Sequence, residues 1–95
     1  MFAVVGTWRM DASMREQQAA ALPHLVDGVR QNAGFVRGFW CEDVEDPAVS
    51  LTFVVFKTLE QAQRFRGAVI ANAPGQGSVG VGQQGLRIVE LRADA

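Results

Sequence analysis

Hydrophobic side chains alternate with small or polar ones in several segments of the chain. In residues 2–9, every second side chain falls on the same face of an extended chain, and this period of two predicts a β-strand. The segments 35–43, 49–57 and 86–92 show strand-like patterns as well, separated by turn and helix signals. The sequence therefore predicts four strands.

The first three of these strands carry apolar groups on both faces. Strict alternation in the second strand puts Phe35, Phe39 and Cys41 on one face and Val36, Gly38 and Trp40 on the other. In the third strand it separates Leu51, Phe53 and Val55 from Val54 and Phe56. Both faces of the sheet are therefore expected to be covered.

A first helix is predicted between the first two strands. Ser13 and Glu16 have the spacing of a capping box, so the helix is expected to start there and to run to about Asn32. Pro23 lies inside it and predicts a kink or a break just before the proline. Gly34 is expected to adopt a left-handed conformation as the C-cap. The expected buried stripe consists of Met14, Ala21, Leu22, Leu25, Val26 and Val29.

A second helix is predicted from Thr58 to about Asn72. Thr58 and Gln61 repeat the capping-box spacing, and Pro74 is expected to end the helix. The inward residues are predicted to be Leu59, Ala62, Phe65 and Val69, with Ile70 as a further candidate. The glycine-rich residues 75–85 are interpreted as a mobile loop, because they precede a strand and lack the lysine of a phosphate-binding loop.

The order strand, helix, strand, strand, helix, strand predicts a ferredoxin-like plait. In this α+β fold a four-stranded antiparallel sheet carries both helices on one face. The 95 residues suffice for one such domain, spanning residues 1–95. Because the helices cover only one face, we expect a second copy of the chain to cover the other, as a homodimer.

The composition and the net charge argue against several kinds of binding partner. The net charge of −1 gives no general attraction to nucleic acid or to an anionic membrane. One cysteine and one histidine cannot form a zinc cluster within the chain, so no metal is expected. The chain also lacks a secretory signal at its start and an apolar run of membrane-spanning length. We therefore expect a cytoplasmic protein.

The run NAGFVRGFWCEDVEDPAVSLTFVVFKTLEQAQRF resembles the central part of the dimeric α/β-barrel proteins, and most of all their antibiotic biosynthesis monooxygenase-like branch. The likeness rests on a glycine-phenylalanine pair after the first helix and on an aromatic-rich third strand, and it extends over nearly the whole chain. It implies the plait and a dimer. Members include cofactor-independent monooxygenases acting on polyketide-type aromatics, haem-degrading enzymes and proteins without an assigned activity.

The haem-degrading members are matched poorly. They use an asparagine on the first strand, a tryptophan where the third strand meets the second helix, and an axial histidine on the second helix. Here the corresponding residues are Thr7 and either Phe56 or Lys57, and residues 62–72 contain no histidine. The resemblance therefore does not extend to haem degradation.

RNA binding is a further alternative, because RNA-recognition modules share the plait order. Residues 51–56 keep the aromatic end of the RNA-binding strand pattern. At its start, however, Val49, Ser50 and Leu51 replace a basic residue, a glycine and an aromatic residue. Together with the acidic balance, this makes RNA an unexpected partner.

The resemblance implies cofactor-independent oxygenation of a small, electron-rich aromatic substrate. His24, or a water molecule near Thr7, is the candidate proton acceptor, since the ordinary pKa of histidine of about 6.5 suits proton transfer at neutral pH. Phe39, Trp40 and Phe65 are the candidate substrate-binding residues.

Other readings of the same residues remain open. His24 fits a surface or interface position as well, and Trp8 and Trp40 fit packing in the core or at a dimer contact. A noncatalytic homodimer that binds a small apolar ligand or another protein is the alternative function.

Overall fold

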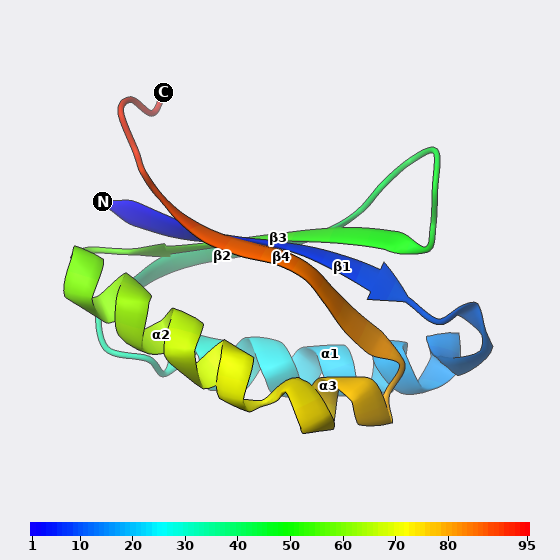
Figure 1. The fold of residues 1–95 in the computed structure, drawn as a ribbon. Coiled ribbons are helices and arrows are strands. Elements are labelled where there is room, and N and C mark those ends of the chain that lie inside the picture. Colours follow the sequence, from blue (N-terminus) through cyan, green and yellow to red (C-terminus); the bar gives the residue numbers. More distant parts are fainter.

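The computed structural model describes all 95 residues and confirms the ferredoxin-like plait. The elements are β1 (Phe2–Met10), η1 (Ala12–Met14), α1 (Arg15–Arg30), β2 (Phe35–Glu42), β3 (Val49–Phe56), α2 (Leu59–Ala71), α3 (Ala73–Ser78) and β4 (Val81–Glu90). The strands form one antiparallel sheet in the order β2-β3-β1-β4. Figure 1 shows all three helices on one side of this sheet, which leaves the other side bare.

The pairing register decides which side chains meet the helices. Val4 of β1 lies opposite Val54 of β3, and both side chains are buried under the helices. Val5 lies opposite Phe53, and these side chains point to the bare side, which we call the open face. The apolar groups therefore separate into a core under the helices and a second set on the open face, where Ala3 and Val55 are buried but Phe53 is exposed.

Phe56 is the centre of the core. Its side chain is 0 % exposed. The ring packs edge-on against Phe35, with centroids 6.4 Å apart, and in a tilted arrangement against Phe65 of α2, with centroids 5.0 Å apart. Such aromatic pairs add to the stabilisation that comes from burial alone. Phe56 thus joins β2, β3 and α2.

The predicted face assignment of β2 is wrong at its first residue. Phe35 lies opposite Phe56 and Arg37 lies opposite Val55, so Val36 is an extra residue in the ladder. A bulge of this kind shifts the alternation of side chains between the two faces of the sheet by one residue. Phe35 therefore packs into the core on the same side as Trp40, whereas Phe39 points to the open face.

The helical segment after β1 starts earlier than predicted, and with a different cap. Asp11, and not Ser13, caps the turn η1: its carboxylate accepts hydrogen bonds from the amide (2.9 Å) and the hydroxyl (2.7 Å) of Ser13. The predicted capping box of Ser13 and Glu16 is therefore wrong. The Ser13 hydroxyl first and its amide second hold the pKa of Asp11 below its ordinary value. The stabilisation from this cap is thus present at neutral pH and is lost as the pH falls through the lowered pKa.

Helix α1 is continuous through Pro23, so the predicted break is absent. Of its predicted buried stripe only Val29 is buried, while Leu22 and Leu25 are 41 % and 49 % exposed. The apolar side of α1 is therefore not seated on the sheet along most of its length.

The start of α2 agrees with the prediction. Thr58 Oγ1 accepts a hydrogen bond from the amide of Gln61, and the Gln61 side chain accepts one from the amide of Thr58, each at 3.2 Å. Gly34 has a φ of +80°, as expected for a left-handed residue. It lies beyond the end of α1, however, and its carbonyl accepts a hydrogen bond from the amide of Lys57. Gly34 thus shapes the turn into β2.

Replacing Gly34 with alanine is expected to lower the free energy of unfolding by about 1–3 kcal/mol. The new Cβ atom would adopt a disfavoured φ and collide with the side-chain amide of Gln61, which caps α2. Gly67→Ala is the matched control, because a Cβ atom at this exposed position in α2 meets nothing. It should stabilise the helix by roughly 0.5–1 kcal/mol. Chemical denaturation of both variants measures the difference, and equal effects would refute this explanation.

The prediction of a mobile glycine-rich loop is wrong. Pro74 does not simply end α2; it occupies the first turn of α3, where a proline needs no amide partner. Gly80, with a φ of +73°, then turns the chain into β4. This strand starts at Val81, opposite Met10, because the long strand β1 offers backbone partners that far. The first part of β4 is rich in glycine and glutamine and has a weak strand pattern, so its pairing with β1 explains why it is extended.

Candidate functional site

A cavity of about 690 Å³ lies on the helix side of the sheet. Side chains from all four strands and from α1, α2 and α3 line it, and 17 of the 29 lining residues are hydrophobic. Leu22 and Leu25 of α1 are among them, so their side chains are exposed because they face the cavity and do not pack on the sheet. The volume falls in the range of small-molecule sites, so the space suits an apolar ligand.

Both tryptophans of the chain line this cavity, and each lies over a glycine of its own strand. A Cβ atom on Gly6 would come within 2.5 Å of Trp8 Nε1, and one on Gly38 within 2.8 Å of Trp40 Cη2. The two indole rings therefore fold back along β1 and β2 instead of standing upright. Because only glycine leaves this room, the repeated Gly-x-Trp spacing fixes both rings as one side of the cavity.

Thr52 of β3 is a polar group on this otherwise apolar part of the sheet. The indole N–H of Trp8 donates a hydrogen bond to Thr52 Oγ1 at 2.9 Å. This bond fills one lone pair of the hydroxyl oxygen and leaves its proton free to donate. Since Thr52 lines the cavity, it can offer that proton to a ligand oxygen.

Three of the five predicted site residues line the cavity, and two do not. His24 of α1, Trp40 of β2 and Phe65 of α2 line it. Thr7 lies opposite Leu51, on the open face. Phe39 lies opposite Phe53 and is 52 % exposed, also on the open face. A water molecule at Thr7 therefore cannot serve this cavity, and the predicted set combined residues from two sides of one sheet.

The prediction missed Thr52, although the pattern contains a signal for it. Residues 50, 52, 54 and 56 share a face of β3, so the hydroxyls of Ser50 and Thr52 lie in line with two buried apolar side chains. A polar side chain in such a row, as Thr52 is, usually has a partner. The partner, Trp8, is 44 residues away in the sequence and could not be named from the pattern.

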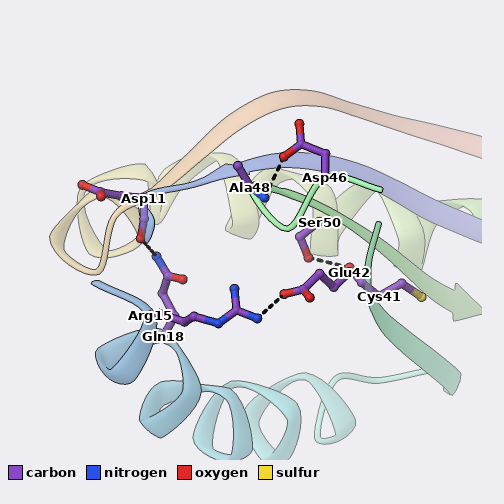
Figure 2. A network of polar contacts seen from close by, with 8 residues as sticks. All are labelled: Asp11, Arg15, Gln18, Cys41, Glu42, Asp46, Ala48 and Ser50. Carbon is purple, nitrogen blue, oxygen red and sulfur yellow. Dashed lines mark hydrogen bonds and ion pairs between the residues drawn. The ribbon is translucent and has the colours of Figure 1, made fainter. Parts of the chain in front are cut away.

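Arg15 and Glu42 are the only permanently charged side chains that line the cavity. Arg15 Nη2 lies 2.8 Å from Glu42 Oε1. Figure 2 shows this ion pair linking the first turn of α1 to the end of β2. Nearby, Gln18 of α1 donates hydrogen bonds to the carbonyls of Asp11 and Val79. These contacts tie the start of α1 to the sheet and to the turn before β4.

Two kinds of feature are absent from the chain. No three or more histidine, cysteine, aspartate or glutamate residues lie close enough together to hold a metal ion. No helix has both the length and the apolar character that a membrane crossing requires.

Neither a known family model nor a curated protein matches the chain. Solved structures do match it. MhuD, a haem degrader from Mycobacterium tuberculosis with two haems in its active site, has a TM-score of 0.77 and 15 % identity over 100 % of this chain and 99 % of that one. SnoaB, a cofactor-independent oxygenase from Streptomyces nogalater, has a TM-score of 0.75 and 10 % identity over 98 % and 94 %.

A third match is a candidate antibiotic biosynthesis monooxygenase from Deinococcus radiodurans, with a TM-score of 0.74 and 20 % identity over 100 % of this chain and 94 % of that one. At these identities the likeness is one of fold, and it covers both chains almost completely. The chain therefore has the fold of the antibiotic biosynthesis monooxygenase-like proteins, as its sequence predicted.

Proposed function

We propose that the cavity binds a planar aromatic compound and that the protein is a cofactor-independent monooxygenase. The observation that carries this proposal is the pairing of two flattened tryptophans with the Thr52 hydroxyl inside one mostly apolar cavity. Indole rings offer flat apolar surface for stacking, and the hydroxyl offers one directed hydrogen bond. A compound such as 1-naphthol presents both a flat ring system and an oxygen.

The proposed reaction needs no group beyond the substrate and dioxygen. A base removes the phenolic proton, and the resulting anion carries negative charge on the ring carbon para to its oxygen. That carbon forms a bond to dioxygen and supplies the electrons. One oxygen atom then leaves as water and the other becomes a second carbonyl, so 1-naphthol and O₂ yield 1,4-naphthoquinone and water. The substrate loses four electrons and dioxygen gains four.

The chain would contribute two groups to this reaction. His24 is the proposed proton acceptor, since it is the one histidine and it lines the cavity. Thr52 is the proposed donor that stabilises the anion, because the Trp8 hydrogen bond orients its hydroxyl. The apolar lining would exclude water and strengthen this hydrogen bond.

The test is oxidation of 1-naphthol, followed by oxygen uptake and by the appearance of 1,4-naphthoquinone. Thr52→Val should lower the rate at saturating substrate at least roughly tenfold, because it removes the donor to the developing charge. Thr52→Ser keeps a hydroxyl and should retain most of the activity. An unchanged rate in the valine variant would remove Thr52 from the reaction, and an unchanged rate in His24→Ala would remove the histidine. If 1-naphthol binds without turnover, the noncatalytic alternative is supported instead.

Haem degradation is not proposed, because the residues do not fit it. Thr7, at the position of the expected asparagine, lies on the open face and away from the cavity. Of the two residues near the position of the expected tryptophan, Phe56 is completely buried and the other is a lysine, Lys57. Helix α2 contains no histidine.

We also propose that the open face is covered by a second copy of the chain, giving a homodimer. Three large apolar side chains on this face are substantially exposed: Phe39 at 52 %, Phe53 at 36 % and Val89 at 38 %. They belong to β2, β3 and β4, so the patch crosses the whole sheet. A contiguous apolar surface of this kind is unfavourable in water, and a two-fold dimer is the simplest way to bury it.

A further inference from the structure

One end of the cavity differs in chemistry from the rest. There the ion pair of Arg15 and Glu42 joins the first turn of α1 to the last residue of β2, as Figure 2 shows. Among the other lining residues none carries a permanent charge, and most are apolar. We propose that Arg15 binds a carboxylate of the ligand, so that the cavity takes a planar aromatic compound that carries a carboxylate as well as the phenolic oxygen. This inference rests on the proposed function and names its class of substrate.

The guanidinium of Arg15 has donors to spare. An arginine side chain carries five N–H donors in a planar fork that matches a carboxylate. One contact to Glu42 is recorded, from Nη2 to Oε1 at 2.8 Å. The remaining donors can therefore bind a second carboxylate, whether or not Arg15 keeps its contact with Glu42.

The pair is also accessible and easily rearranged. The side chains of Arg15 and Glu42 are 60 % and 52 % exposed. Ion pairs with this exposure contribute little to stability, because water competes for both charges. A ligand can therefore displace Glu42 from Arg15 without disrupting the fold.

The position of the pair suits a ligand lying against the tryptophans. Glu42 faces Ser50 of β3, and Ser50 in turn faces Trp8 of β1. Neighbouring strands are about 4.8 Å apart, so Glu42 and Trp8 are roughly 10 Å apart across the sheet. A bicyclic ring with its carboxylate at Arg15 can reach the Trp8 ring over this distance.

Glu42 then competes with the ligand carboxylate for Arg15. It occupies Arg15 in the empty cavity and repels a second carboxylate at the same place. Replacing Glu42 with glutamine should therefore strengthen binding of an anionic ligand, whereas replacing Arg15 should weaken it. A site selective for neutral ligands would show neither change.

The experiment compares the affinities for 1-naphthoate and 1-naphthol by calorimetry, in the intact protein and in single variants. The intact protein should prefer 1-naphthoate. Arg15→Gln should reduce the affinity for 1-naphthoate relative to that for 1-naphthol roughly tenfold, because charge-assisted hydrogen bonds are strong. Glu42→Gln should raise the same ratio several-fold. Arg30→Gln is the matched control: it removes the same charge from the same helix, but Arg30 pairs with Asp27 and does not line the cavity. The Arg30→Gln variant should have the same ratio of affinities as the intact protein.

The carboxylate site and the proposed function can be refuted by different results. Equal effects of Arg15→Gln and Arg30→Gln, or a preference for 1-naphthol in the intact protein, would refute the carboxylate site and leave the aromatic cavity in place. Failure of both compounds to bind the intact protein would refute the proposed function, and the carboxylate site with it.

Discussion

Replacing Phe56 with alanine is expected to lower the free energy of unfolding by about 3–5 kcal/mol. Its side chain is fully buried and contacts Phe35 and Phe65 on two other elements. The loss includes both the transfer of the ring to water and the void that it leaves. Small domains have total stabilities of about 5–15 kcal/mol, so this single substitution should remove a large share of the total and move the unfolding transition to a much lower denaturant concentration.

Phe39→Ala is the matched control for this substitution. It removes the same atoms from the open face, where the ring is half exposed. At a protein concentration low enough for the chain to be monomeric, it should cost less than about 1 kcal/mol. Denaturant unfolding followed by circular dichroism measures both variants. A similar loss in the two would show that the core is not organised around Phe56.

Replacing Phe53 with glutamate is expected to convert the proposed dimer into a folded monomer. Phe53 lies on the open face of β3, between Val5 of β1 and Phe39 of β2. A carboxylate there would lose its water in a dimer, which costs several kcal/mol (~3–5). In the monomer the same carboxylate stays in contact with water, so the fold should persist.

Light scattering and circular dichroism together measure this effect. Leu59→Glu provides the matched control, because Leu59 is 43 % exposed but lies on α2, on the other side of the sheet. It adds the same charge and should leave the dimer intact. A monomeric intact protein, or a dimer that survives Phe53→Glu, would contradict the assignment of the open face.

The two helix starts show how far local patterns predict structure. Thr58 and Gln61 form the capping box that their spacing predicts. Ser13 has the same spacing to Glu16, but Asp11 lies two residues earlier and its carboxylate takes both the amide and the hydroxyl of Ser13. A stronger acceptor just outside a motif can therefore shift the start of a helix.

The strand patterns predicted the sheet but only part of the site. Adjacent residues of a strand point to opposite faces, so Phe39 and Trp40 cannot both line one cavity. The bulge at Val36 then moved Phe35 to the side of Trp40, and no local signal marks that extra residue. Thr52 gained its importance from a partner on another strand, which only the folded register identifies.

The exposed leucines of α1 illustrate a different limit of the sequence. Helical periodicity predicted Leu22 and Leu25 as core residues because they are apolar and correctly spaced. Periodicity reports which side of a helix faces inward, but not whether that side touches the sheet. Here it faces a cavity, so the residues that suggested packing instead form part of the candidate binding site.

The most direct test of the central claim is to locate a bound aromatic compound by NMR in methyl-labelled protein. On titration with 1-naphthol, the methyl signals of Leu22, Leu25 and Val69, which line the cavity, should shift and show contacts to the ring protons. The methyl groups of Leu51 and Val89 on the open face should not. Contacts to the open face, with the cavity signals unchanged, would show that the space beneath the helices is not the binding site.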